Sequence, residues 1–262
     1  MHLTKHHGLG NDFLVLTDPT GTRPLTPQLA QAACDRRRGI GADGLLRLSP
    51  GTHGTQVSMQ LRNADGSAAE MSGNGIACLV QAALLTGLAQ GPEVTVSSEA
   101  GRRSVVSTPG SSPTSHVMTV DMGDAKVGDD EPAWIRGPVR RAARVDIGNP
   151  HLVLHLDDLD AVDLDALGVE VNESVPGGSN VELLTLGPGE AELTMRVYER
   201  GVGRTEACGT GACAVAAAAE DWGLAPAAVR VHQPGGAVTI DVGAPTHMTV
   251  TVVHVATIEW HQ

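Results

Sequence analysis

The sequence carries one short motif twice, in which a carboxylate stands two residues before a hydroxyl or thiol that is followed by Gly-x-Gly. The two copies are Glu70-Met71-Ser72-Gly73-Asn74-Gly75 and Glu206-Ala207-Cys208-Gly209-Thr210-Gly211. An apolar run follows each copy, IACLVQAALLT and ACAVAAAAEDW, and each run ends at a glycine, Gly87 or Gly223. A glycine just past an apolar run is typical of the left-handed residue that ends a helix. The pattern predicts that Ser72 and Cys208 each stand at the start of a helix.

Such a helix start can bind an anion and change the acidity of a thiol. The first N–H groups of a helix have no partner within it and lie at the positive end of its dipole, so they bind a carboxylate, and the glycines allow close approach. We expect Cys208 to be exposed and to have a pKa below the usual 8.5 or so. With Cys208 on one face of a bound carbon and Ser72 on the other, a proton could leave one side and return to the other. The alternative for Ser72 is a plain helix cap.

The two halves of the chain resemble each other. Residues 59–89 align without a gap with residues 195–225, and residues 10–16 (GNDFLVL) align with residues 148–154 (GNPHLVL). The offsets are nearly equal, so the sequence predicts two homologous domains, 1–120 and 121–262. If the domains face each other about a pseudo-two-fold axis, both helix starts open onto one cleft.

Short alternating segments such as QVSMQLR, EVTVSS, HVMTVDM, AELTMRVY and VTIDV predict strands in both halves. Each half has one convincing central helix. We therefore expect an α/β (α+β) fold of two pseudo-symmetric domains, each a mostly antiparallel sheet wrapped around a helix, with the active site in the cleft between them. Residues 109–115 (PGSSPTS) and 128–132 (GDDEP) read as surface loops.

The composition excludes several classes of function. The formal charge is −12, from 18 Lys and Arg against 30 Asp and Glu, which disfavours nucleic acids and anionic membranes as partners. The chain lacks an apolar run of the roughly 18 residues needed to span a bilayer, and its first residues do not resemble a secretion signal. We expect a cytoplasmic protein with reduced thiols that acts on a small molecule.

Other candidate sites are weaker. Residues 39–44 fit Gly-x-Gly-x-x-Gly, but a helical segment precedes them and a strand-like segment follows, the reverse of a dinucleotide site. The histidines and cysteines lack metal-binding spacing, so we expect no metal site. Cys34, Cys78 and Cys213 lie among apolar residues and are expected to be core residues.

Six segments in order along the chain resemble diaminopimelate epimerases. They are KHHGLGNDF (5–13), RRRGIGADG (36–44), RNADGSAAEMSGNG (62–75), GNPH (148–151), GSNVE (178–182) and YERGVGRTEACGTGA (198–212). The resemblance implies a cofactor-independent isomerase, requiring no pyridoxal, that interconverts LL- and meso-diaminopimelate by two-base proton transfer in lysine and peptidoglycan precursor biosynthesis.

The resemblance also assigns roles to residues. It implies that Cys208 and Ser72 are the acid/base pair and that His151 tunes them. It implies contacts of Asn63 and Glu199 with the reacting amino group. The reacting carboxylate would be bound by the N–H groups at Gly73, Asn74, Gly209 and Thr210, and the distal end of the amino acid would be held by Asn11, Asn149, Asn180 and Arg200.

Three positions depart from the family pattern. The family usually has cysteine where this chain has Ser72, arginine where it has Ala77 and often glutamate where it has Arg204. Serine is a far weaker acid than cysteine, so three explanations stay open: an active serine variant, a cysteine replaced to inactivate the enzyme, or one-base chemistry.

The alternatives to this function are a racemase or epimerase of another amino acid on the same fold and an amino-acid-binding protein that Ser72 makes inactive. Isomerases of phenazine biosynthesis rank lower. The sequence leaves the oligomeric state open, with a homodimer among the alternatives.

Overall fold

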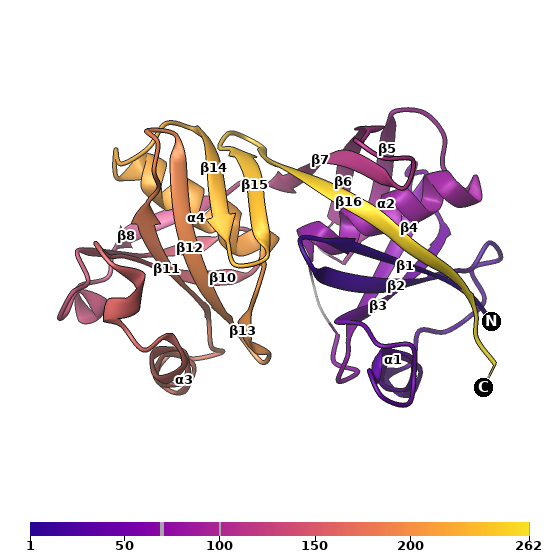
Figure 1. Ribbon diagram of the computed structural model, residues 1–262, viewed down its shortest axis with the longest axis horizontal. Helices are drawn as coiled ribbons and strands as arrows, with labels where there is room; N and C mark the ends of the chain where they lie inside the picture. Colours follow the sequence, from indigo (N-terminus) through magenta and orange to yellow (C-terminus); the bar gives the residue numbers. More distant parts are fainter. Residues whose placement is uncertain (69–70, 100, 262) are drawn as a thin grey trace. The chain divides into compact units, whose positions relative to one another are not determined.

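A computed structural model of the protein describes residues 1–68, 71–99 and 101–261 (Figure 1). The chain forms two compact units: unit 1 comprises Met1–Asp121 and Thr249–Gln262, and unit 2 comprises Met122–Met248. The chain therefore passes from one unit to the other twice, and its last residues lie in unit 1, whereas the sequence analysis grouped them with the second half. Glu70 of the first motif lies outside the described residues.

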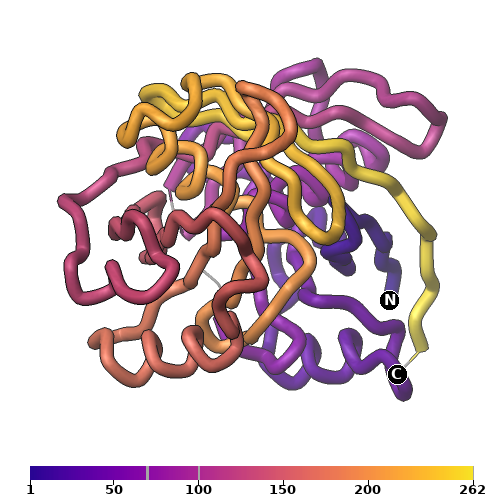
Figure 2. Tube along the Cα trace, turned by 60° about the vertical axis from the view of Figure 1, so that its left-hand side comes forward, coloured from indigo at the N-terminus to yellow at the C-terminus, as the bar shows by residue number. Residues whose placement is uncertain are grey.

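Unit 1 is a closed sheet around one helix. Its strands are β1 (His2–Gly8), β2 (Asn11–Thr17), β3 (Gly44–Pro50), β4 (Val57–Asn63), β5 (Glu93–Ser98), β6 (Gly101–Pro109), β7 (Ser115–Gly123) and most of β16 (Thr246–Glu259), and its helices are α1 (Pro27–Cys34) and α2 (Gly73–Thr86). The strands neighbour one another in this order, and β1 also pairs with β16, which closes the ring. The two ends of the chain consequently lie side by side in Figures 1 and 2.

Unit 2 also has a sheet with a central helix, and its strands lie in the order β15-β14-β12-β11-β10-β9-β8. Its strands are β8 (Lys126–Asp130), β9 (Arg141–Asp146), β10 (Pro150–His155), β11 (Asn180–Leu186), β12 (Glu192–Glu199), β13 (Gly203–Thr205), β14 (Ala228–Gln233) and β15 (Gly236–Asp241). Its helices are α3 (Leu164–Ser174) and α4 (Gly209–Asp221), with short 3₁₀ turns η1 (Pro132–Trp134) and η2 (Leu159–Ala161). The predicted fold class, with a mostly antiparallel sheet and a central helix in each half, is confirmed.

The central helices α2 and α4 form where the motifs predicted them. Both are buried on every side over their first eleven residues, as expected for helices that are apolar all round. Gly87 and Gly223 adopt the predicted left-handed conformation after them, with φ of 73° and 68°. No helix in the described ranges is long and apolar enough to cross a membrane.

Two details of the sequence analysis need correction. Residues 128–130, expected in a loop, belong to strand β8, whose side chains are mostly exposed because it lies at the sheet edge and pairs with β9 alone among the described strands. Helix α3 was not expected. It begins at Asp163, whose carboxylate accepts from the N–H groups of Asp165 and Ala166.

His6 is a buried histidine inside the ring of unit 1. Its Nδ1 lies 2.7 Å from Oε1 of Gln81 on α2, and its Nε2 lies 2.8 Å from Oγ1 of Thr4. Burial lowers the pKa of His6 to about 4; the Gln81 hydrogen bond opposes this shift, and nearby His254 adds to it.

We predict that this histidine destabilises the fold in acid. The unfolded chain binds the proton near pH 6.5 and the folded chain only near pH 4, so stability present above pH 6.5 is lost as the pH falls towards 4, by about 3 kcal/mol in total. Urea unfolding at pH 7.5 and 4.5 measures this loss. It should shrink in His6→Asn and persist in the control His2→Asn, whose side chain is 76% exposed; an equal loss in both variants would contradict the assignment.

Candidate functional site

Cys208 is the cap residue of α4. Its backbone is extended, with φ −130° and ψ 115°, and its Sγ accepts a hydrogen bond from the Gly211 N–H at 3.3 Å. Its own N–H donates to Oε1 of Gln233 on β14 at 2.7 Å. Cys208 is only 6% exposed, so the expectation that the surrounding glycines expose it is wrong. Strands β8 to β12, β14 and β15 of unit 2 all pack against α4.

The pKa of Cys208 is likewise opposite to the expectation. Burial raises it well above its ordinary value, and the nearby carboxylates of Glu199 and Glu182 raise it further. The hydrogen bonds from Thr210 and Gly211 lower it, as a helix start should, but they are outweighed. In the free protein, Cys208 is therefore held as a thiol.

Glu199 stands at the end of β12 and shares this environment. Burial raises its pKa, and Glu182 adds to the shift, while hydrogen bonds from the Thr205 hydroxyl and the Cys208 thiol oppose it. Each of the two groups, Glu199 and Cys208, disfavours the negative charge of the other. Such a pair titrates together, so a proton removed from the thiol has an acceptor at hand in the carboxylate.

Four further polar groups form a chain beside Cys208. Nδ1 of His151 lies 2.7 Å from Oε1 of Glu182, and its Nε2 lies 3.0 Å from Oδ1 of Asn149. Nδ2 of Asn149 donates to Oγ1 of Thr210 at 3.5 Å, and that hydroxyl lies 3.4 Å from Sγ of Cys208. The side chains of His151 and Glu182 are fully buried.

The sequence analysis missed Glu182 and Gln233. Glu182 lies in the GSNVE segment that contributed to the resemblance, two residues after Asn180, and this alternation on β11 places both side chains on one face. Gln233 ends β14, and no sequence signal relates it to Cys208, from which it is 25 residues distant.

The predicted residues Asn180 and Arg200 are held together. Oδ1 of Asn180 accepts from the Arg200 backbone N–H at 2.9 Å, and its Nδ2 donates to the Pro150 carbonyl at 3.0 Å. The exposed Arg200 guanidinium donates to the Gly177 carbonyl at 3.0 Å. The amide of Asn180 therefore fixes the backbone from which the guanidinium extends.

Ser72 caps α2 as Cys208 caps α4. Its backbone is also extended, with φ −147° and ψ 115°, and its Oγ accepts from the Gly75 N–H at 3.0 Å. Asn74, in the first turn of α2, is 2% exposed, and its Nδ2 donates to Oδ1 of Asn11 at 3.4 Å. The two helix starts thus repeat the same local geometry in their respective units.

Both helix starts leave two N–H groups free. In the part of the chain that the structure describes, no acceptor reaches the N–H groups of Gly73 and Asn74 in unit 1, or those of Gly209 and Thr210 in unit 2. These are the four groups that the sequence analysis assigned to a carboxylate. Paired N–H groups at a helix start suit an anion.

The segment with the Gly-x-Gly-x-x-Gly pattern supports Asn11. It joins α1 to β3, as the sequence order predicted, and contributes Asp43, whose carboxylate accepts from Nδ2 of Asn11 at 2.9 Å. Arg36 bonds both Asp43 and Asp12 at 2.7 Å. The ion pairs therefore fix the position of a candidate substrate-binding amide.

Asn63, at the end of β4, hydrogen-bonds to Ser67 at 3.0 Å. No hydrogen bond of the described residues joins its side chain to Asn11 or Asn74. In the internal repeat it corresponds to Glu199, and both residues end the strand that precedes a motif.

The two units differ beneath their helix starts. The repeat and the register of the parallel strand pairs place Phe13 and Leu46 of unit 1 where unit 2 has His151 and Glu182. A Cβ on Gly75 would lie 3.6 Å from the Phe13 ring, whereas a Cβ on Gly211 would lie 2.8 Å from Oε1 of Glu182. The first turn of α2 therefore lies against the Phe13 ring, where the first turn of α4 lies against the Glu182 carboxylate.

The other positions that the sequence analysis discussed lie in the core or on the surface. Ala77, Cys78 and Cys213 are completely buried in α2 and α4, and Cys34 is 3% exposed, so the prediction that these three cysteines are core residues is confirmed. Arg204 lies on the surface, 3.4 Å from Asp165 of α3.

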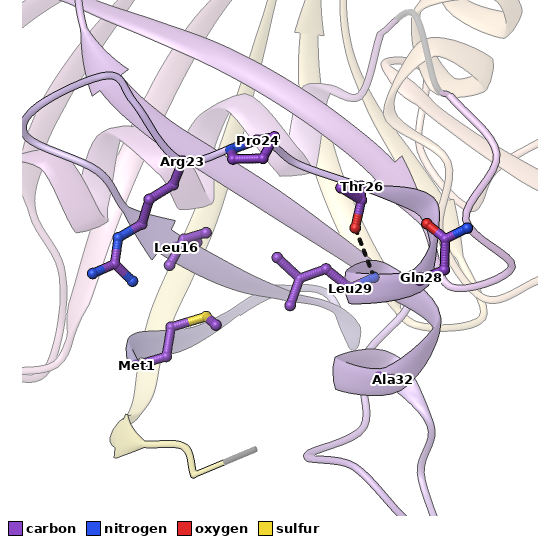
Figure 3. A pocket seen from close by; sticks show the side chains of 8 residues that line it. All are labelled: Met1, Leu16, Arg23, Pro24, Thr26, Gln28, Leu29 and Ala32. Carbon is purple, nitrogen blue, oxygen red and sulfur yellow. Dashed lines mark hydrogen bonds between the residues drawn. The ribbon is translucent and has the colours of Figure 1, made fainter.

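A cavity of about 560 Å³ lies in unit 1, between helix α1 and Met1 (Figure 3). Its lining combines apolar side chains with the guanidinium of Arg23, the hydroxyl of Thr26 and the amide of Gln28, and the full set is Met1, Leu16, Arg23, Pro24, Thr26, Gln28, Leu29 and Ala32. None of the predicted site residues is among them, so this cavity is separate from the two helix starts.

Comparison with solved structures identifies the same fold in several other proteins. A phenazine biosynthesis protein of the PhzF family from Bacillus anthracis matches with a TM-score of 0.74 over 100% of this chain and 99% of its own, at 12% identity. A probable proline racemase from Agrobacterium radiobacter K84 matches with a TM-score of 0.72 over 99% and 92%, at 16% identity. At these identities, the likeness establishes the fold alone.

Sequence comparison establishes the family. The model of the family described as diaminopimelate epimerase matches residues 3–128 and 143–257. The diaminopimelate epimerase of Mycolicibacterium smegmatis is 41% identical over 94% of this chain and 91% of its own length, and that of Moorella thermoacetica is 38% identical over 92% and 91%. The prediction of an isomerase of the epimerase class is confirmed. This chain belongs to the diaminopimelate epimerase family.

Proposed function

We propose that this protein interconverts LL- and meso-diaminopimelate in the cytoplasm by two-base proton transfer, with Cys208 and Ser72 as the groups that face the reacting carbon. The observation that carries the proposal is the pair of matching helix starts, each with an acid/base side chain at the cap and two free N–H groups behind it. Membership of the diaminopimelate epimerase family supports the choice of substrate.

The free N–H groups address the main difficulty of the reaction. The α-hydrogen of an amino acid is very weakly acidic, so without a cofactor the charge that develops on the carboxylate must be stabilised by donors already in place. We assign this task to the N–H groups of Gly73, Asn74, Gly209 and Thr210.

The proton chemistry follows from the pair of Cys208 and Glu199. In the free protein, burial and the two carboxylates keep Cys208 protonated. Bringing the substrate ammonium beside them offsets the negative charge and favours transfer of the thiol proton to Glu199, which leaves a thiolate to take the α-hydrogen. Ser72 then supplies a proton to the opposite face, and after product release the Ser72 alkoxide recovers a proton from water while the Glu199 carboxyl gives one up. In the reverse direction the thiol is the donor.

We assign Arg200 to the distal carboxylate, with Asn180 fixing its backbone and Asn11 and Asn149 lining the site. A planar guanidinium binds a carboxylate through two parallel hydrogen bonds, which an ammonium cannot reproduce. We predict that Arg200→Lys raises KM by about tenfold or more, the cost of about one charge-assisted hydrogen bond, with a smaller change in kcat.

Steady-state kinetics with LL-diaminopimelate measures both constants. The matched control is Arg204→Lys, because Arg204 lies four residues further on and pairs with Asp165 on the surface. An unchanged KM in Arg200→Lys would contradict the distal role.

Incubating the purified protein with LL-diaminopimelate in D₂O tests the proposed function. Chromatographic separation of the stereoisomers measures inversion, and mass spectrometry measures deuterium at the α-carbon. We expect meso product containing deuterium. Binding without exchange would instead identify an amino-acid-binding protein, and inversion of a different amino acid alone would identify another racemase on this fold.

A further inference from the structure

The hydrogen bonds beside Cys208 assign a donor and an acceptor to each pair of atoms. Both ring nitrogens of His151 face oxygen atoms, Oε1 of Glu182 and Oδ1 of Asn149. The amide oxygen accepts only, and an ionised carboxylate does the same. The arrangement is therefore satisfied when His151 carries a proton on each nitrogen and Glu182 is ionised.

The same assignment of donors and acceptors extends from Asn149 to the Cys208 thiol. Because Oδ1 of Asn149 faces His151, its Nδ2 is the atom that donates to Oγ1 of Thr210. The hydroxyl accepts that hydrogen bond and has its own hydrogen left for Sγ of Cys208, 3.4 Å away. Sγ also accepts from the Gly211 N–H. Both of these hydrogen bonds favour the thiolate form of Cys208.

We propose that Glu182 is a positioning residue for the proposed epimerisation: by holding His151 as an imidazolium, it orients Asn149 and Thr210 so that the Thr210 hydroxyl donates to the Cys208 thiolate as it forms. The inference rests on the proposed role of Cys208. It extends that role to a carboxylate that touches neither the substrate nor the sulfur atom.

The burial of Glu182 supports a dedicated role. Its side chain is fully buried, and its Oε2 has no hydrogen-bond partner among the described residues. A buried carboxylate is costly unless it is paired, and here the partner is His151. The negative charge also raises the pKa of Cys208 directly, so Glu182 has two opposite effects on the thiol. The titratable groups that bear on Cys208 are Glu182, Glu199 and, through the chain, His151.

A double-mutant cycle separates the two effects of Glu182. The cycle combines Glu182→Gln, which keeps the shape but removes the charge, with Thr210→Val, which replaces the hydroxyl with a methyl group. The readout is the pH profile of Cys208 alkylation by iodoacetamide in the substrate-free protein, with the labelled peptide quantified by mass spectrometry. Thr210→Val should slow alkylation of Cys208 about fivefold to tenfold at a fixed pH below its pKa, the effect of losing one hydrogen bond, and Thr210→Ser should restore it.

In the Glu182→Gln background, Thr210→Val should change the rate of Cys208 alkylation by less than a factor of two. Without the charge, His151 is neutral, Asn149 turns its amide to donate to Nε2, and the Thr210 hydroxyl then donates to Asn149 instead of to sulfur. A purely Coulombic role for Glu182 predicts instead that the two substitutions act independently, and such additivity would overturn the proposal.

The matched control is Glu192→Gln, which removes the carboxylate of another histidine pair in unit 2, with Oε2 of Glu192 3.0 Å from Nε2 of His232. It should leave the Thr210→Val effect unchanged. Nitrogen NMR of the His151 ring in the unmodified protein provides a test that does not depend on folding of a variant. Two protonated nitrogens at neutral pH support the proposal, and a neutral ring contradicts it.

These measurements are made without substrate. Additive alkylation effects together with observed inversion of diaminopimelate would reject only the role of Glu182. Coupled effects without inversion would reject the proposed function and retain the hydrogen-bonded chain.

Discussion

Replacing Cys208 with alanine should lower both inversion and α-deuterium exchange by a factor of about 10² to 10⁴, the usual contribution of an acid/base group. The thiol caps α4 and receives hydrogen bonds from Gly211 and Thr210. It is also hydrogen-bonded to the Glu199 carboxylate. The other cysteines, Cys34, Cys78 and Cys213, lie within helices, where they are buried, and burial raises the pKa of all three, that of Cys34 to about 12.

Cys213→Ala is the matched control, because Cys213 lies in the same helix and is completely buried. We expect it to cost about 1 kcal/mol of stability while leaving kcat within about twofold. Cys208→Ala protein that keeps more than about a tenth of the activity at an unchanged unfolding midpoint would contradict an acid/base role. Bound substrate should also protect Cys208 from iodoacetamide.

The architecture was predictable because it rests on local and periodic signals. The alternating segments became strands within one or two residues of the expected bounds, for example β5 and β12. The helix starts were predictable because Ser72 and Cys208 each precede a run that is apolar on every side and ends at a glycine. Helix α3 gave a weaker signal, since only Asp163 marks its start and its buried residues are few.

The state of Cys208 was not predictable from its neighbours in sequence. The field of a helix start argues for a lowered thiol pKa, and Gly209 and Gly211 argue for exposure. Both arguments omit the strands that cover the site and bring Glu182 from β11 and Glu199 from β12. Burial depends on these long-range contacts, and in this site it outweighs the local field.

The repeat predicted that the two helix starts are alike, but it did not predict that different side chains lie beside them. The same alignment that relates Ser72 to Cys208 relates Phe13 to His151, and the strand register then relates Leu46 to Glu182. Only the register of β2 with β3 and of β10 with β11 reveals that one helix start is underlain by an ionisable pair and the other by apolar side chains. The asymmetry bears directly on Ser72.

Ser72 should make the two halves of the proposed reaction unequal. A hydroxyl is a far weaker acid than a thiol, and in its own unit Ser72 has Phe13, not a histidine, beneath the helix start. We therefore expect deuterium to enter from the Cys208 face faster than the substrate inverts. The ratio of exchange to inversion, measured in one D₂O incubation, quantifies the difference.

Ser72→Cys should raise the inversion rate at least tenfold, about 1.4 kcal/mol of barrier, and bring inversion level with exchange. The site can accept a thiol, because Ser72 and Cys208 have closely similar extended backbones, and Cys208 Sγ accepts from Gly211 as Ser72 Oγ accepts from Gly75. The matched control is Ser72→Ala, which should abolish inversion while sparing exchange on the Cys208 face. If Ser72→Cys leaves inversion unchanged or lowers it, then serine is an adequate proton carrier or takes no part in the reaction, and the weak acidity of its hydroxyl does not limit this enzyme.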